Sequence, residues 1–380
     1  MRELLHVRAL TVDLPTARGW VRPVNELSLR IGAGESLGLV GESGSGKTML
    51  ALALMGLLPP GAKTGGKAIL TTQSAAKKNS PEAQNLEYLA AEQNVSSGRN
   101  LNVGCNLATL NETEWRRKRG LDVAMIFQEP MTSLNPVMRV GDQIAEAITA
   151  HHKNMQAAEV ERCVLEALRL AAVPEPAIRS QQFPHQLSGG LRQRVMIAMA
   201  IAAGVRDQSV DAAPLEQRVM GKPMSHPRLL IADEPTTALD VTVQKQILEL
   251  LDALRRKLGL GLLFITHDLG AVARVADRVA VMYAGRIVEE GPVGEVLRFP
   301  RHPYTQGLIA ASPTLERGRL TPIAGVVPQL TELPPGCSFE PRCSLRLPEC
   351  RETIPALRNA GINHAARCIL VGDEVVHELR

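Results

Sequence analysis

Eight consecutive residues near the N-terminus have the composition of a phosphate-binding loop. They fit the pattern G-x-x-x-x-G-K-[ST], in which glycines let backbone N–H groups point inward at phosphate oxygens. The residues are Gly41, Glu42, Ser43, Gly44, Ser45, Gly46, Lys47 and Thr48. In this pattern the Lys47 ammonium reaches the β- and γ-phosphates of a nucleotide, and the Thr48 hydroxyl binds Mg²⁺. The alternative interpretation is a glycine- and serine-rich turn without a ligand.

A second group of side chains could supply acid–base chemistry at a bound phosphate. Residues 229–232 are an apolar run that predicts a buried parallel strand, and Asp233 and Glu234 follow it directly. In P-loop ATPases an acidic residue at such a strand end holds Mg²⁺, and Glu234 is placed to accept a proton from attacking water. Residues 262–266 predict another strand, and His267 follows it at the edge where open α/β sheets bind ligands. A surface histidine without a chemical role is the alternative for His267.

The elements around residues 41–48 fit a phosphate site. Residues 36–40 are apolar and of strand length, and residues 49–58 predict an apolar helix that ends at the Pro-Pro-Gly sequence of residues 59–61. The loop therefore lies between a strand and a helix. The N-terminus of that helix adds the positive end of its dipole to the anion site.

A third segment, residues 187–191, precedes a helix that we predict to continue to residue 203. With the other segments, in this order and spacing, it makes the chain resemble the nucleotide-binding subunits of ABC transporters. The resemblance identifies the signature as Ser188, Gly189 and Gly190, the Q-loop residue as Gln128, the D-loop residue as Asp240 and the switch histidine as His267.

The resemblance implies a head-to-tail dimer with two ATP molecules at its interface. Each ATP lies between the P-loop of one subunit and the signature of the other. A helix N-terminus with two glycines can approach a γ-phosphate closely, but it cannot easily reach the phosphate in its own P-loop. The resemblance also implies Thr48, Gln128 and Asp233 around Mg²⁺, with Glu234, His267 and Gln128 as the catalytic residues.

Longer stretches are similar to one branch of this family, the dipeptide and oligopeptide importers. These are residues 122–142, 231–243 and 277–290, followed by an HPYT sequence at residues 302–305. The resemblance implies an ATPase that energises the import of peptides. The same role for nickel, glutathione or another small solute stays open, because the solute contacts other chains.

The branch implies partners and a location. Leu191 stands where the signature often has glutamine, which resembles the D-type subunit that pairs with a different, F-type ATPase. Two membrane permease subunits and an extracytoplasmic solute-binding protein complete the expected importer. The chain would then lie peripherally on the cytoplasmic face of the cell membrane. No run of about 18 apolar residues and no secretory signal is visible in the sequence.

The expected fold class is α/β, a P-loop NTPase of the ABC type. It would have a parallel core sheet, a β-rich N-terminal subdomain, a helical signature subdomain and a small C-terminal extension. We expect the ATPase domain over residues 1–295, with the helical subdomain at about 130–227, and the extension over 296–380. Residues 71–106 and 204–227 are insertions, interpreted as tolerated surface loops or as added regulatory or docking surfaces.

Four cysteines cluster in the extension. Their spacing is C-x₅-C-x₆-C-x₁₇-C, and they are Cys337, Cys343, Cys350 and Cys368. An ATPase of the cytosol should not depend on disulfides, whereas four thiolates suit a [4Fe–4S] cluster or Zn²⁺. Iron–sulfur is the favoured prediction, and zinc or no metal at all are the alternatives.

Composition excludes few function classes. Aromatic residues make up only 3% of the chain, which argues against a base-stacking nucleic-acid surface, and the net charge of +4 demands no anionic partner. A soluble ABC ATPase that acts on nucleic acid or ribosomes, and a catalytically inactive regulatory subunit, are the remaining alternatives. The family resemblance also implies an aromatic residue that stacks on adenine, and its identity stays open. Trp20 is the aromatic residue nearest to the expected position, but a tryptophan there could equally serve packing.

Overall fold

The computed structural model describes residues 2–17, 19–71, 104–129, 133–205, 226–237, 239–313, 315 and 320–372. Within these ranges a central sheet has eight strands in the order β11-β12-β10-β9-β3-β8-β7-β6. Their bounds are β3 (Ser36–Val40), β6 (Val123–Ile126), β7 (Leu229–Asp233), β8 (Gly261–Thr266), β9 (Arg278–Tyr283), β10 (Arg286–Pro292), β11 (Arg358–Gly361) and β12 (His364–Ala366). Pairing is parallel from β9 through β3, β8 and β7 to β6, and antiparallel at the β10 end. The strands predicted at residues 36–40, 229–232 and 262–266 are thus confirmed.

A second, antiparallel sheet forms from the N-terminal residues. Its order is β2-β1-β4-β5, with β1 (Glu3–Thr16), β2 (Gly19–Gly32), β4 (Lys63–Thr71) and β5 (Gly104–Asn106). The helix α1 (Lys47–Met55) packs between this sheet and the central one, with Leu50 and Leu54 fully buried. It starts two residues earlier than predicted and ends at Gly56, whose left-handed backbone (φ 62°) caps it before Pro59.

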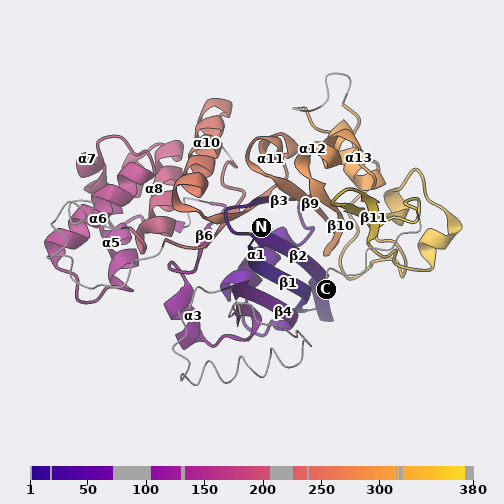
Figure 1. Cartoon of the computed structure of the whole chain (residues 1–380), viewed down its shortest axis with the longest axis horizontal. Helices are drawn as coiled ribbons and strands as arrows, with labels where there is room; N and C mark the ends of the chain where they lie inside the picture. The colour runs from indigo at the N-terminus through magenta and orange to yellow at the C-terminus, as the bar shows by residue number, and fades with distance from the viewer. Residues whose placement is uncertain are drawn as a thin grey trace.

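A helical lobe lies at one side of the central sheet (Figure 1). It contains α5 (Val140–Thr149), α6 (Ala157–Leu170), α7 (Pro176–Ser180) and α8 (Gly189–Ala202), and α10 (Val241–Leu258) lies next to it. A break separates α5 from α6, so residues 140–170 form two helices. None of the helices in the described residues has the length and apolar character to cross a bilayer.

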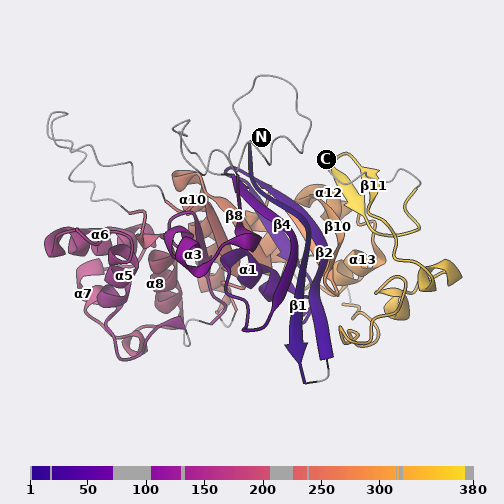
Figure 2. The same ribbon diagram turned by 90° about the horizontal axis from the view of Figure 1, so that it is seen from below.

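The C-terminal region lies on the opposite side of the central sheet (Figures 1 and 2). After α11 (Leu269–Val275), α12 (Val293–Arg298) and α13 (Pro303–Ala310) come two single-turn 3₁₀ helices, η4 (Glu340–Arg342) and η5 (Pro348–Arg351). The strand β12 pairs with β10, so the end of the described chain extends the central sheet. The buried Glu289 of β10 accepts hydrogen bonds from His364 of β12 and from the backbone N–H groups of Arg301 and His302. This carboxylate fixes the C-terminal region to the sheet.

Short segments complete the described chain. The α3 helix (Glu112–Lys118) and β6 precede Gln128, and two further 3₁₀ turns are η1 (Leu107–Thr109) and η2 (Pro184–Gln186). Most of both predicted insertions falls outside the described residues. Thr71 pairs with Gly104, however, so the two ends of the first insertion lie side by side.

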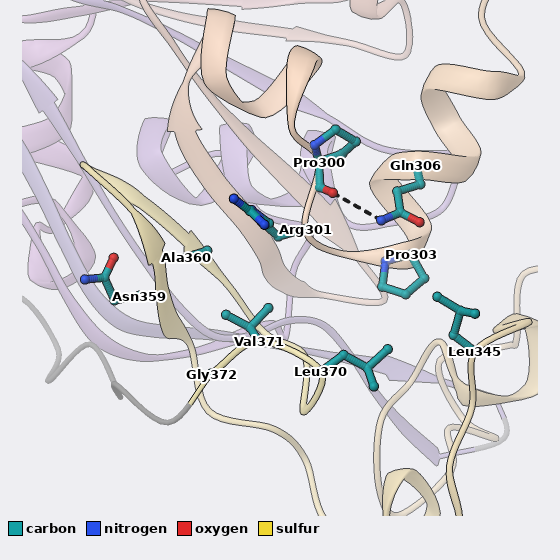
Figure 3. A pocket seen from close by; sticks show the side chains of 10 residues that line it. All are labelled: Pro300, Arg301, Pro303, Gln306, Leu345, Asn359, Ala360, Leu370, Val371 and Gly372. Carbon is teal, nitrogen blue, oxygen red and sulfur yellow. Dashed lines mark hydrogen bonds between the residues drawn. The ribbon is translucent and has the colours of Figure 1, made fainter.

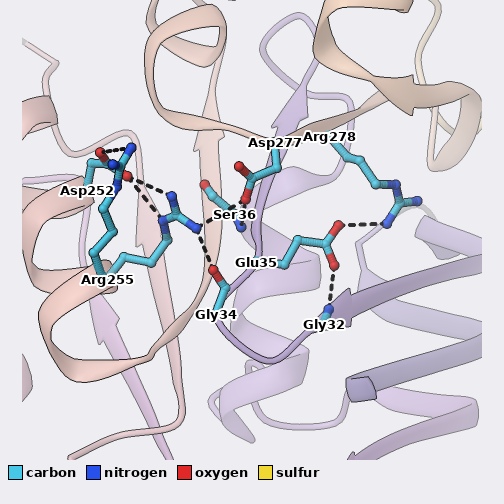
Figure 4. A network of polar contacts seen from close by, with 9 residues as sticks. Gly32, Gly34, Glu35, Ser36, Asp252, Arg255, Asp277 and Arg278 are labelled. Atoms are coloured by element: carbon cyan, nitrogen blue, oxygen red, sulfur yellow. Dashed lines mark hydrogen bonds and ion pairs between the residues drawn. The ribbon is translucent and has the colours of Figure 1, made fainter. Parts of the chain in front are cut away.

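A polar network holds the turn that leads into β3 (Figure 4). Glu35 accepts a hydrogen bond from the Gly32 N–H and one from the Arg278 guanidinium of β9. Arg255 of α10 bonds to the Gly34 carbonyl and to Asp277, which in turn accepts from the Ser36 N–H. The start of β3 is thereby held by α10 and by the start of β9, and β3 leads directly into residues 41–48.

Candidate nucleotide site

The loop of residues 41–48 joins β3 to α1, the context its sequence predicted. Gly44 and Gly46 have left-handed backbones, with φ of 80° and 105°. A Cβ atom on Gly46 would lie 1.9 Å from the carbonyl oxygen of Pro23, and one on Gly41 would lie 2.2 Å from that of Met282. The glycines are therefore required both by conformation and by the close approach of β2 and β9.

The Lys47 side chain curls over the loop. Its Nζ donates hydrogen bonds to the carbonyl oxygens of Gly41 (2.7 Å) and Glu42 (2.9 Å). Burial lowers the pKa of Lys47, and the negative charges of Glu234, Asp233 and Glu42 act in the opposite direction. An ammonium held by the carbonyls of its own loop can exchange them for phosphate oxygens.

Asp233 has the properties of a Mg²⁺ ligand. The residue is 1% exposed, and its Oδ1 atom is buried without a hydrogen-bond partner in the described residues. Burial raises the pKa of Asp233, while a hydrogen bond from the Thr48 hydroxyl lowers it. A carboxylate oxygen and a hydroxyl side by side are the hard oxygen donors that Mg²⁺ prefers, so the residues present fit this ion.

Three side chains converge on the carboxylate of Glu234. Its Oε2 accepts hydrogen bonds from Thr237 Oγ1 (2.9 Å) and Gln128 Nε2 (3.3 Å), and His267 Nδ1 lies 3.3 Å away. The His267 hydrogen bond holds the pKa of Glu234 below its usual value, and the same contact raises the pKa of His267. Glu234 is thus an ionised carboxylate beside Lys47 and Asp233, able to accept a proton.

The signature and D-loop residues lie elsewhere. Ser188 caps α8, accepting a hydrogen bond from the Leu191 N–H, and Asp240 caps α10 through the Val243 N–H. A Cβ atom on Gly190 would lie 2.6 Å from Val243 Cγ1, so the two helix starts are packed together. The helices α8 and α10, which these residues begin, lie on the side of the molecule that carries the helical lobe, whereas α1 lies between the two sheets (Figures 1 and 2). The structure therefore brings together Lys47, Gln128, Asp233, Glu234 and His267, but not the signature.

Three contacts at the candidate nucleotide site were not predicted from the sequence. Thr237 contacts Glu234, as described above. Tyr304 Oη accepts a hydrogen bond from the Glu42 N–H (2.8 Å), and Arg342 binds the Glu42 carboxylate through two bonds of 2.6 and 3.0 Å. The HPYT sequence pointed to Tyr304 only as a family landmark, and no local pattern pointed to Arg342.

Trp20 lies at the end of the β1–β2 hairpin. It is 51% exposed, and the Lys63 ammonium lies 4.4 Å from the centroid of its ring. A role in stacking on adenine stays a prediction.

The four C-terminal cysteines line one small cavity together with His302 and Phe339. Burial raises the pKa of Cys337 to about 11, and the three other thiols contribute in the same direction. Nevertheless, no group of three or more His, Cys, Asp or Glu side chains in the described residues is arranged to hold a metal ion. The predicted metal site is therefore not confirmed.

A separate pocket lies between α13 and the last described residues (Figure 3). It has a volume of about 420 Å³, and Gln306 at its wall donates a hydrogen bond to the Pro300 carbonyl. It contains none of the residues of the phosphate loop, so it is not part of the candidate nucleotide site.

Comparison with known proteins agrees with this geometry. Residues 24–206 match the family model described as ABC transporter, and residues 288–350 match that of the oligopeptide/dipeptide transporter C-terminal region. The chain is 41% identical to a putative peptide import ATP-binding protein of Brucella ovis, over 96% of both chains. It is 40% identical to the dipeptide transport ATP-binding protein DppD of Bacillus subtilis, over 99% of this chain and 97% of the relative.

The fold also matches solved structures. A dimeric structure of a bacterial ABC transporter cassette aligns with a TM-score of 0.56 at 22% identity, covering 76% of this chain and 99% of the other. The predicted α/β fold of the ABC type is thereby confirmed. The fold and the sequence matches define an ABC-type ATPase, with ATP and Mg²⁺ as its expected ligands. The chain belongs to the ABC transporter ATP-binding proteins, in the branch that carries the oligopeptide/dipeptide transporter C-terminal region.

Proposed function

We propose that this chain energises the import of di- and oligopeptides through partner membrane permeases, from the cytoplasmic face of the membrane. The single observation that carries this function is that the phosphate loop and the Asp233–Glu234 pair occur in one chain with a C-terminal region of the peptide-transporter type over residues 288–350. The names of relatives similar over nearly the full chain support the peptide cargo. Nickel, glutathione or another small solute is the alternative cargo.

The test is reconstitution of the whole importer. The chain, a second ATPase, two permease subunits and the solute-binding protein are placed in lipid vesicles. ATP hydrolysis should rise when the binding protein carries a di- or oligopeptide. Stimulation by nickel or glutathione, and not by peptides, would reassign the cargo while retaining the ATPase role.

The proposed catalytic roles follow from the contacts at Glu234. Glu234 accepts the proton of the attacking water, His267 and Gln128 orient its carboxylate, and Lys47 neutralises phosphate charge. Thr48 and Asp233 would hold Mg²⁺ with Gln128 nearby, and the bound ion would neutralise charge that develops on the transferred phosphate. A serine hydroxyl and backbone N–H groups at Ser188, Gly189 and Gly190 would bind the phosphate held by another subunit, with Asp240 at the same interface.

We infer that the other subunit is an F-type ATPase rather than a second copy of this chain. Leu191 in the signature supports this pairing. The placement of α8 in the helical lobe and of α1 between the two sheets (Figure 1) supports the need for a second subunit of either kind.

We also propose a functional division at residue 295. Residues 1–295 form the ATPase domain, with the helical subdomain at about 130–227, and residues 296–380 form the C-terminal extension. Because β12 pairs with β10, we expect the extension to fold on the ATPase domain and not alone. Independent folding of a fragment of residues 296–380 would contradict the expectation that the extension folds only on the ATPase domain.

A [4Fe–4S] cluster at the four cysteines remains our proposal for the extension, with Zn²⁺ as the alternative. The arrangement of all four thiols around one cavity supports it. Metal binding would require the thiols to lose their protons and draw closer together. Protein purified without oxygen should be brown and contain about four irons per chain. Stoichiometric zinc would favour a structural zinc site, and metal-free, fully active protein would remove the proposal.

A further inference from the structure

The phosphate loop carries a negative charge of its own. Glu42 is the second residue of the loop, and its side chain is 28% exposed. Its charge acts on the Lys47 ammonium, the group that binds phosphate in such loops. An uncompensated carboxylate at this position would repel the triphosphate that the loop accepts.

Arg342 compensates this charge from the far end of the chain. Its two terminal nitrogens bind the two Glu42 carboxylate oxygens in parallel, at 2.6 and 3.0 Å, across 300 residues of sequence. The Arg342 side chain is only 3% exposed. A bidentate pair with so little access to water fixes the position of the carboxylate as well as cancelling its charge.

Arg342 is itself held rigidly. Its Nε donates to the carbonyl oxygen of Ala324 at 3.0 Å, and its guanidinium lies 5.9 Å from the ring centroids of both Tyr283 and Phe339. These rings pack against Tyr304, with centroid separations of 4.6 Å to Tyr283 and 5.3 Å to Phe339. The Tyr304 hydroxyl accepts the Glu42 N–H, so one cluster holds both the side chain and the backbone of Glu42.

We propose that Arg342 and Tyr304 are positioning residues of the nucleotide site, which neutralise and orient Glu42 so that the loop binds a polyphosphate. The C-terminal extension is then part of the nucleotide site and determines its affinity for phosphate charge. This inference rests on the proposed role of residues 41–48 as the phosphate site.

The test measures binding of ATP, ADP and adenosine to the full chain, without Mg²⁺ and at two salt concentrations. In Arg342→Gln the dissociation constant for ATP should rise about tenfold at low salt. The effect should be smaller for ADP and absent for adenosine, and it should shrink at high salt because the partly exposed Glu42 carboxylate left unpaired in this variant is screened. Adding Glu42→Gln to this variant should return ATP affinity to within about threefold of wild type, because the unpaired carboxylate is gone.

Two further variants separate electrostatics from loosening of the extension. Arg351→Gln removes the exposed Arg351 partner of the buried Glu340, which lies on the same 3₁₀ turn as Arg342, and it should leave ATP affinity unchanged. Tyr304→Phe keeps the ring and removes only the hydroxyl, and it should weaken ATP binding about threefold. The proposal is overturned if Arg342→Gln weakens adenosine and ATP equally, if Glu42→Gln does not restore binding, or if Arg351→Gln has the same effect.

Two more variants complete the test. Arg342→Lys retains the positive charge without the two parallel hydrogen bonds of the guanidinium, and it replaces the glutamine variant if that variant does not fold. Its ATP affinity should lie between those of wild type and Arg342→Gln. Equality with wild type would overturn the proposal. Lys47→Ala should lose ATP binding whatever the state of Arg342. If it does not, the assignment of residues 41–48 as the phosphate site fails. That result is different from failure of the proposal for Arg342 and Tyr304.

Discussion

Glu234 has a backbone conformation that non-glycine residues rarely adopt. Its φ of 45° lies in the left-handed region, which costs of the order of 1–3 kcal/mol. The surrounding hydrogen bonds from Thr237 and Gln128 keep the carboxylate at this position. Strain of this kind, next to Asp233, is consistent with a residue selected for its chemistry.

Replacing Glu234 with Gln tests its role as the base. The amide keeps the size and much of the hydrogen bonding, but it cannot accept a proton. We expect hydrolysis to fall roughly 10²- to 10⁴-fold, with ATP binding retained and a closed dimer accumulating with the partner. Phosphate release and nucleotide binding measured on the same preparation check this, and wild-type turnover would remove the assignment.

The sequence predicted the residues of the site better than their supporting contacts. Lys47, Asp233 and Glu234 belong to contiguous motifs whose spacing defines their chemistry, so they could be identified without a structure. Arg342 could not, because its partner Glu42 is 300 residues away and nothing local distinguishes it from other arginines.

At the scale of elements, boundaries set by tertiary packing were the least predictable. The chain between α5 and α6 contains neither glycine nor proline, so the sequence offered no signal for the break. The pairing of β12 with β10 is similarly invisible, since β12 is only three residues long and depends on Glu289 and His364. Elements with strong periodic or motif signals, such as β3, β7 and β8, were predicted within one residue.

The contact between α8 and α10 predicts different outcomes for two adjacent glycines. A methyl group on Gly190 would lie 2.6 Å from Val243, whereas one on Gly189 would lie 3.6 Å from Leu239, an ordinary contact. We therefore expect Gly190→Ala to destabilise the protein by about 1–3 kcal/mol and Gly189→Ala to be close to neutral. Urea unfolding of both variants compares them directly, and equal losses would contradict this packing.

The start of α13 predicts a dependence of stability on pH. Burial lowers the pKa of His302 from 6.5 to about 4, and its Nδ1 accepts the Tyr304 N–H as the helix cap. Between these two pH values the unfolded chain binds a proton that the folded chain does not. Stability should therefore fall by about 1.4 kcal/mol per unit as the pH drops from about 6.5 to about 4.

The matched variant for this prediction is His302→Asn, which retains a capping acceptor without the titrating ring. Unfolding of metal-free protein is measured at pH 7, 6 and 5 for both chains. The wild type should lose more stability than the variant at each step, and parallel curves would show that His302 does not titrate in this way.

At the scale of the whole molecule, the candidate site is divided between two sides. The phosphate loop, Glu234 and His267 meet at the central sheet, and the signature starts α8 in the helical lobe. Alone, this chain should hydrolyse ATP slowly, and addition of the partner ATPase should raise the rate severalfold or more. Robust, cooperative hydrolysis by the purified chain as a homodimer would reject the F-type pairing.

The bond between Glu42 and Arg342 has a consequence for biosynthesis. The phosphate loop leaves the ribosome early, but the arginine that neutralises it is made 300 residues later, which is roughly 15–60 s at ordinary rates of translation. During this interval the nascent chain has its phosphate loop but lacks Arg342 and the last strands of the central sheet. If the pair strengthens phosphate binding as proposed, the full affinity of the loop for nucleotide is therefore expected only when synthesis is nearly complete.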